Sequence, residues 1–129
     1  MKFRDDYFAV FKGKEFVLSV STEGKLELIS HDPADLSLGF RRNSEGVYFL
    51  PVKKEDLESY YEINTYVRFK GFDFGIQSEK GNNILIFTGG DIRLAKKLDL
   101  EVGDKGIYQK WVKEADLEKV WEEKSPLDL

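Results

Sequence analysis

The residues that could carry out acid–base, metal or nucleophilic chemistry are few in this chain of 129 residues. His31 is the only histidine, and there is no cysteine. A zinc site is therefore not expected, because zinc sites combine several histidine or cysteine ligands. The TGGD segment at 88–91 lacks the lysine and the glycine spacing of a phosphate-binding loop. We expect no catalytic residue, no metal, no cofactor and hence no enzyme.

Carboxylates are the remaining candidates for chemistry or binding, and many of them lie in two segments. Residues 55–62 carry four acids and no base, whereas residues 114–123 carry five acids and one lysine. Glutamates in the second segment recur every four residues, so on a helix they would share one face. Such a face could bind a basic protein partner, although a solvated helix also carries charge. The candidate partner-binding residues are Glu114, Glu118, Glu122, Glu123, Glu58 and Glu62.

The two acidic segments belong to a sequence repeat. GVYFLPVKKEDLESYYE at 46–62 and GIYQKWVKEADLEKVWE at 106–122 are identical at eight of seventeen positions. Upstream, FKGKEF at 11–16 matches FKGFDF at 69–74 at four of six. An internal repeat of this kind indicates a duplicated structural unit.

Both repeats show the same order of predicted elements. Alternating β-forming residues predict a hairpin with its turn at Gly13 or Gly71, followed by a third strand. A short helical segment comes next, with Pro33 in its first turn in one repeat and Asp91 as its cap in the other. After a fourth strand, the closing segment has apolar residues at helical spacing, such as Leu117. It therefore predicts an amphipathic helix.

These elements together predict an α+β fold with an internal duplication. It consists of two ββ-β-α-β-α-like units with pseudo-twofold symmetry, mostly antiparallel strands, and helices on one face. We expect a single domain, 1–129, built of two repeats at about 6–62 and 64–122. The closing helices would cover the core with Leu57 and Leu117 and present their acids outward.

Composition narrows the class of protein. Apolar residues make up 41% of the chain and aromatic residues 14%, which is typical of a globular fold. The net charge of −4 disfavours direct binding of nucleic acid. No apolar run is long enough to span a membrane, and the charged start is unlike a signal peptide. We expect a cytoplasmic protein.

The most distinctive stretches are FKG, at 11–13 and 69–71, and VK-x-x-DLE, at 52–58 and 112–118. As a whole the chain resembles the small cytoplasmic immunity proteins of bacterial polymorphic-toxin and contact-dependent inhibition systems. The shared traits are small size, acidity, abundant aromatic residues, and the lack of cysteine and catalytic residues.

This resemblance implies binding to a cognate toxin domain, often a nuclease, and occlusion of its active site. An acidic surface suits the basic cleft of a nuclease. The alternative is a small-molecule or peptide-binding module that uses the crevice between the two repeats. The oligomeric state does not follow from the sequence.

Overall fold

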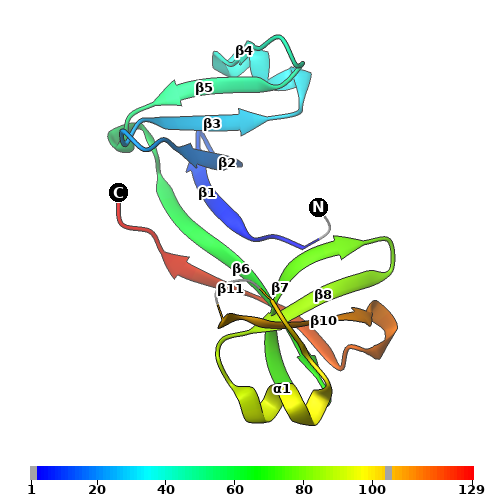
Figure 1. Cartoon of the computed structure of the whole chain (residues 1–129). Helices are drawn as coiled ribbons and strands as arrows, with labels where there is room; N and C mark the ends of the chain where they lie inside the picture. Colours follow the sequence, from blue (N-terminus) through cyan, green and yellow to red (C-terminus); the bar gives the residue numbers. More distant parts are fainter. Residues whose placement is uncertain (1–2, 104–105) are drawn as a thin grey trace. The chain divides into compact units, whose positions relative to one another are not determined.

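The structure is a computed structural model that describes residues 3–103 and 106–129. Its contacts divide the chain into two compact units. The first, here called the N-unit, comprises Asp5–Ile63 and Lys124–Leu129. The second, the C-unit, comprises Asn64–Glu123 and the residues up to Arg4. Figure 1 labels most of the strands of both units.

The N-unit is built of antiparallel strands and two short 3₁₀ helices. Its strands pair in the order β4-β5-β3-β2-β1-β6. The elements are β1 (Asp6–Phe11), β2 (Lys14–Val20), β3 (Leu26–Ser30), η1 (Pro33–Leu38), β4 (Arg41–Arg42), β5 (Tyr48–Val52), η2 (Lys54–Asp56) and the first half of β6 (Ser59–Phe69).

The C-unit repeats this plan. Its strands pair in the order β9-β10-β8-β7-β6-β11, so each element occupies the position of its counterpart in the N-unit. The elements are the second half of β6, β7 (Phe72–Lys80), β8 (Asn83–Thr88), α1 (Ile92–Leu98), β9 (Glu101–Val102), β10 (Tyr108–Lys113), η4 (Glu114–Asp116) and β11 (Lys119–Pro126). The sequence repeat is thus accompanied by a repeat of topology.

The two FKG motifs form the tight hairpin turns that the sequence predicts. Lys12 and Gly13 have φ angles of 49° and 77°, and Lys70 and Gly71 have φ angles of 49° and 83°. Two successive positive φ angles define the two-residue turn whose twist matches that of the flanking strands. The second position is glycine because it has no Cβ to clash in this conformation.

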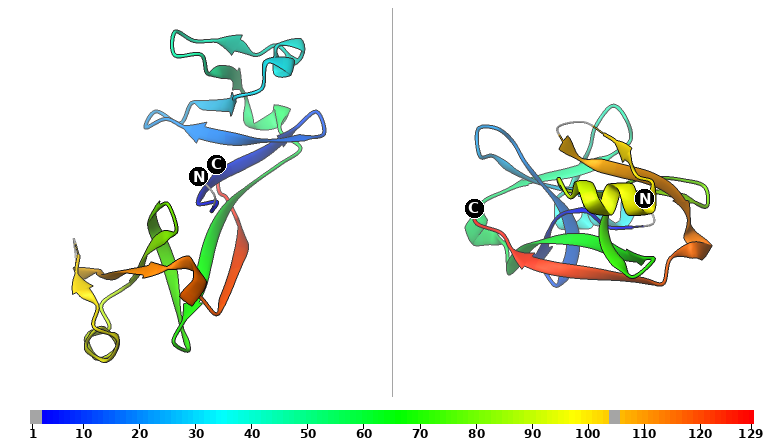
Figure 2. Two further views of the ribbon diagram at one scale, coloured as in Figure 1. Left: turned by 90° about the vertical axis from the view of Figure 1, so that its right-hand side faces the viewer. Right: turned by 60° about the horizontal axis from the view of Figure 1, so that its bottom comes forward.

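Each unit has its own hydrophobic core, contributed mainly by alternate residues of its strands. The C-unit core also takes Leu98 from α1, the short helix seen end-on in the left view of Figure 2. The buried residues of the N-unit core are Ala9, Phe11, Phe16, Leu18, Leu28, Phe40, Tyr48 and Leu57. Those of the C-unit core are Phe3, Val67, Phe69, Phe74, Ile76, Ile84, Ile86, Leu98 and Val112.

The expected α+β fold, with helices on one face of each unit, is wrong. Among the described residues α1 is the single α-helix, and the remainder of the ordered structure is mostly one antiparallel sheet of eleven strands. The predicted closing helices are single 3₁₀ turns, η2 and η4, each followed by a long strand. In both segments the chain is already extended at the leucine after the turn, with ψ of 134° at Leu57 and 131° at Leu117.

The error has a physical origin in the run that follows the first turn. From Tyr61 to Phe69 every second residue is buried, and most of these residues are β-branched or aromatic. That alternation continues across the boundary expected between the repeats, so β6 forms one uninterrupted strand. Leu57, Tyr60 and Tyr61 fit a helical spacing locally, but the longer run with a period of two prevails.

Two smaller predictions are confirmed. Asp91 caps α1, with its carboxylate accepting from Arg93 N and Leu94 N, both at 3.1 Å. Pro33 lies in the first turn of the corresponding element, although η1 is a 3₁₀ helix. In the part of the chain that the structure describes, no helix is both long and apolar enough to span a membrane.

Candidate functional site

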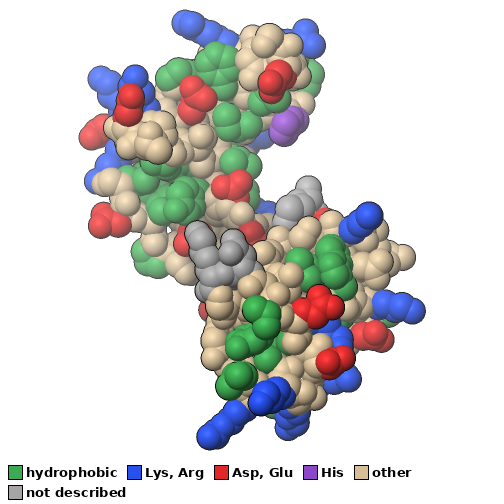
Figure 3. Space-filling view, viewed as in Figure 1, with side chains coloured by type: hydrophobic (Ala, Val, Ile, Leu, Met, Phe, Trp, Pro, Cys, Tyr) green, Lys and Arg blue, Asp and Glu red, His purple; other side chains and the backbone are tan. Residues whose placement is uncertain are grey.

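The acidic face proposed for the closing helices has no helix to carry it. On β11 the side chains of Glu122 and Glu123 point to opposite faces, and Glu114 lies in the turn before the strand. Glu62 is half-buried in β6, opposite Tyr7 of β1. On the face shown in Figure 3, acidic side chains are scattered among basic and apolar ones. The four-residue spacing of these glutamates therefore has no structural counterpart.

Glu58 and Glu118 instead hold the hairpin turns of their own units. Glu58 Oε1 accepts from Gly13 N at 2.7 Å, and Glu118 Oε1 accepts from Gly71 N at 2.6 Å. The main chain adds a second contact in each unit, from Glu58 N to Val10 O and from Glu118 N to the equivalent strand. We call this pair of contacts the turn clasp. It links the two repeated motifs through the glycine of FKG and the glutamate of VK-x-x-DLE.

Glu122 is also engaged within the chain. It forms a two-point ion pair with Arg4, with distances of 2.9 and 3.1 Å. The hydrogen bond from Arg4 lowers the pKa of the Glu122 carboxyl. Both side chains remain partly exposed, so the pair is one of the surface kind that contributes little to stability.

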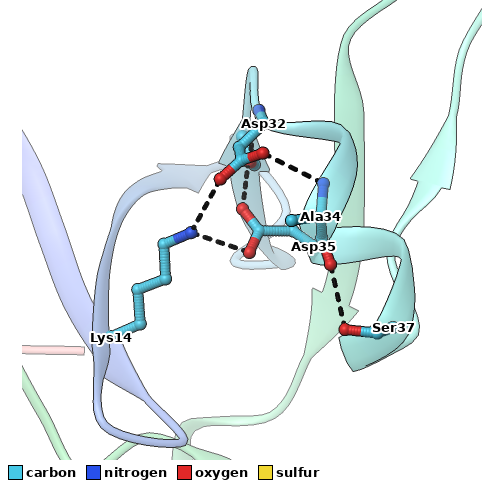
Figure 4. A network of polar contacts seen from close by, with 6 residues as sticks. Lys14, Asp32, Ala34, Asp35 and Ser37 are labelled. Carbon is cyan, nitrogen blue, oxygen red and sulfur yellow. Dashed lines mark hydrogen bonds and ion pairs between the residues drawn. The ribbon is translucent and has the colours of Figure 1, made fainter.

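The most connected polar cluster lies in the N-unit around η1 (Figure 4). Lys14 Nζ contacts Asp35 Oδ1 at 2.8 Å and Asp32 Oδ2 at 3.4 Å, while Ser30 Oγ donates to the other oxygen of Asp35. Asp32 caps η1 by accepting from Ala34 N at 3.0 Å. Asp35 is buried, so these donors supply the hydrogen bonds that its carboxylate would otherwise lose.

The ionisation of this cluster does not suit acid–base catalysis. Burial acts to raise the pKa of Asp35, but hydrogen bonds from Lys14 and Ser30 outweigh it and leave the pKa lowered. The hydrogen bond to Asp35 in turn raises the pKa of Lys14. Both groups are therefore charged at neutral pH. A general acid or base works best when its pKa lies near that pH, which is not the case for either group.

Comparison with the C-unit supports a structural role for the cluster. Phe72 stands at the position of Lys14, and Leu94, three residues after the cap of α1, corresponds to Asp35. Both pack against the C-unit core. The same fold is thus completed by a salt-bridged cap in one unit and by apolar side chains in the other.

A different feature, in the C-unit, has the character of a binding site. A cross-strand row runs over the sheet face opposite the core: Tyr66 of β6 pairs with Gly75 of β7, and Gly75 pairs with Phe87 of β8. Trp121 of β11 stacks on Tyr66 with ring centroids 6.0 Å apart. Together they line a hollow that we call the aromatic groove. Its lining comprises Tyr66, Asp73, Phe74, Gly75, Phe87, Thr88, Gly89, Trp121 and Glu123.

Gly75 allows the ring of Phe87 to lie close to the backbone of β7. A Cβ added there would lie 2.6 Å from Phe87 Cε1, closer than real contacts allow. The ring of Phe87 therefore covers the glycine, and part of the groove floor is bare backbone. In the N-unit the corresponding residue is Val17, which lines a hollow at the equivalent place together with Phe8 and Ile29. Both units thus have a hollow at this place, and the glycine and the tryptophan distinguish the one in the C-unit.

Two carboxylates line the groove, and a lysine lies over one of its rings. Asp73 and Glu123 are its only charged lining residues. Glu123 accepts from Trp121 Nε1 at 3.1 Å, which orients the indole. Lys119 Nζ lies 5.1 Å from the centre of the Trp121 ring, and in the N-unit Lys124 Nζ lies 3.9 Å from that of Tyr61, the equivalent position. Such contacts are the geometry of cation–π attraction.

Of the six predicted residues, only Glu123 lines the aromatic groove. A closing helix would place Trp121 beside Leu117 on its packed side, whereas β11 places Trp121 in the groove. One signal was present in the sequence: glycine at 75 interrupts an alternating strand where the first repeat has valine. An isolated glycine in a strand often marks a close approach by another group.

The fold and groove define a mostly antiparallel β-protein made of two topologically equivalent units, one of which bears an aromatic surface groove. The chain belongs to the family described as uncharacterised conserved protein UCP033725, whose model matches residues 3–128. No curated protein and no solved structure matches the chain.

Proposed function

We propose that this is a non-enzymatic, cytoplasmic protein of the immunity type, which binds a basic toxin domain and blocks its active site. The aromatic groove of the C-unit is the observation that carries the proposal. Tryptophan and tyrosine dominate the energetics of protein interfaces, and here they are stacked, half-buried and flanked by carboxylates.

The chemistry of the groove favours a cationic side chain from the partner. An arginine can stack on an aromatic ring while its N–H groups reach a carboxylate. Arg68 already pairs with Asp73 at 3.0 Å, and Lys119 already covers Trp121. The free protein therefore holds its own cations where a partner cation would bind. Nucleases carry such cations in the clefts that bind phosphate.

Growth protection tests this function. The probe is the product of the gene adjacent to this one, expressed in a bacterial host with and without this protein. The native protein should restore growth. Trp121→Ala should abolish protection, whereas Trp111→Ala should retain it, because Trp111 is 47% exposed on β10 but does not line the groove.

Thermal unfolding of both variants separates loss of the groove from loss of the fold. If the native protein gives no protection, the immunity function is wrong. If Trp121→Ala remains folded and protects as well as Trp111→Ala, the groove is not the binding site.

A further inference from the structure

A second cavity lies wholly within the N-unit, at the ends of β2, β3 and β5. It has a volume of about 570 Å³, within the range of small-molecule sites. We call it the lysine pocket. Its lining comprises Val20, Gly24, Lys25, Leu26, Pro51, Val52, Lys53, Lys54, Asp128 and Leu129.

The lining combines apolar walls with a cationic rim. Three lysines and one carboxylate side chain line the cavity, and Lys25 also pairs with Glu23 at 3.4 Å. Val20 is 37% exposed, although Phe16 and Leu18 on the same strand belong to the core. An apolar surface beside several ammonium groups suits a ligand that has both an apolar chain and a negative charge.

The chain itself provides an example of this recognition. Lys54 Nζ donates to the main-chain oxygen of Leu129 at 3.2 Å. The leucine belongs to the lining and packs against the N-unit core. At this pocket a lysine thus already donates to an oxygen atom, and an aliphatic side chain already forms part of the apolar wall.

The C-unit offers an internal comparison. A cavity at the equivalent place is lined by Asn82, Asn83, Lys113, Glu114 and Ala115. Asn83 stands where the N-unit has Lys25, and Glu114 stands where it has Lys54. The fold therefore does not require lysines at these positions, and the positive rim is confined to one unit.

From this geometry we infer that the lysine pocket binds an unbranched aliphatic carboxylate, with its chain along Val20, Leu26 and Val52 and its carboxylate among Lys25, Lys53 and Lys54. The inference is independent of the aromatic groove, which lies in the other unit. Decanoate is a suitable probe because it has both parts of the ligand. Decanol keeps the chain without the charge, and acetate keeps the charge without the chain.

Calorimetric titration at pH 8, below the micelle concentration, tests the inference. Decanoate should bind the native protein at least tenfold more tightly than decanol or acetate. The double variant Lys25→Asn/Lys54→Glu installs the residues that the C-unit carries at the equivalent positions, so the fold should accept it. It should weaken decanoate binding at least tenfold and remove the preference over decanol. Lys113→Ala, at the equivalent of Lys53 in the other unit, is the matched control and should change nothing.

Methyl NMR spectra locate the ligand. Shifts at Val20, Leu26 and Val52 on addition of decanoate support the site. The inference is overturned if decanoate does not bind, if it binds the double variant as tightly as the native protein, or if the shifts fall elsewhere. Binding of vesicles that contain decanoate, without binding of the monomer, would also overturn it, because the surface would then recognise a lipid bilayer. Growth protection by the double variant should be unchanged, so failure here is distinguishable from failure of the toxin-binding proposal.

Discussion

Replacing Glu58 by alanine removes the side-chain half of the turn clasp. Gly13 N then loses the carboxylate oxygen that accepts its hydrogen bond at 2.7 Å, and only water can replace it. A hydrogen bond to a charged group contributes about 1.5–3 kcal/mol when buried. Both ends of this one are exposed, so we expect a loss near 1 kcal/mol in the free energy of unfolding. For a chain of this length that corresponds to a fall of about 4 °C in Tm.

The repeat provides an internal replicate of this experiment. Glu118→Ala breaks the equivalent contact to Gly71, at 2.6 Å, and should cost a similar amount. The two clasps share no residue, so the losses should add in the double variant. Glu58→Gln keeps an acceptor oxygen and should lose less than Glu58→Ala. Urea denaturation measures all four variants.

The clasp reasoning is refuted if both alanine variants stay within about 0.3 kcal/mol of the native protein, because that is the usual range for surface changes without structural partners. An alanine variant that keeps its stability but loses growth protection would instead support the partner-binding role that the sequence predicts for Glu58 and Glu118.

Four further substitutions test the packing and the charged cap. Leu57→Ala should cost about 2–5 kcal/mol of unfolding free energy, and Leu117→Ala less, since Leu117 is only partly buried; equal losses in denaturant would contradict this order. Gly75→Ala should cost about 1–3 kcal/mol, because its Cβ meets Phe87; an unchanged Tm would show that the ring moves freely. The lowered pKa of Asp35 means that its contribution is present above its ordinary pKa and is lost as the pH falls through the folded-state value. Between pH 5 and pH 2 the native protein should therefore lose more stability than Asp35→Asn, and parallel pH profiles would count against the ionised pair.

The sequence alone predicted the features that depend on local chemistry. Glycine after lysine in FKG specifies a tight turn because few other residues tolerate the second positive φ angle. Asp91 marks the start of α1 because its carboxylate satisfies free N–H groups there. The repeat itself was visible as residue identities, and the strand order of the two units repeats as well.

The closing segments could not be assigned from the same kind of evidence. In DLESYYE the apolar residues fit both a helical and an alternating pattern, and the decision depends on the strand-forming run up to Phe69 and on the strands that pair with β6. The aromatic groove depends on pairing between residues distant in the chain, since Gly75 meets Phe87 only through strand register. The lysine pocket likewise depends on the meeting of the turn at Gly24 with the end of β5.

The affinity of the purified toxin domain for three forms of this protein tests the proposed function most directly. The forms are the native protein, Trp121→Ala and Trp111→Ala, compared by calorimetry at low and at physiological salt. The account predicts that Trp121→Ala weakens binding by about 30-fold, the effect of losing an interface tryptophan that contributes about 2 kcal/mol. Trp111→Ala should bind as the native protein does. Equal affinity of all three forms for the toxin domain would contradict the assignment of the aromatic groove as the binding site.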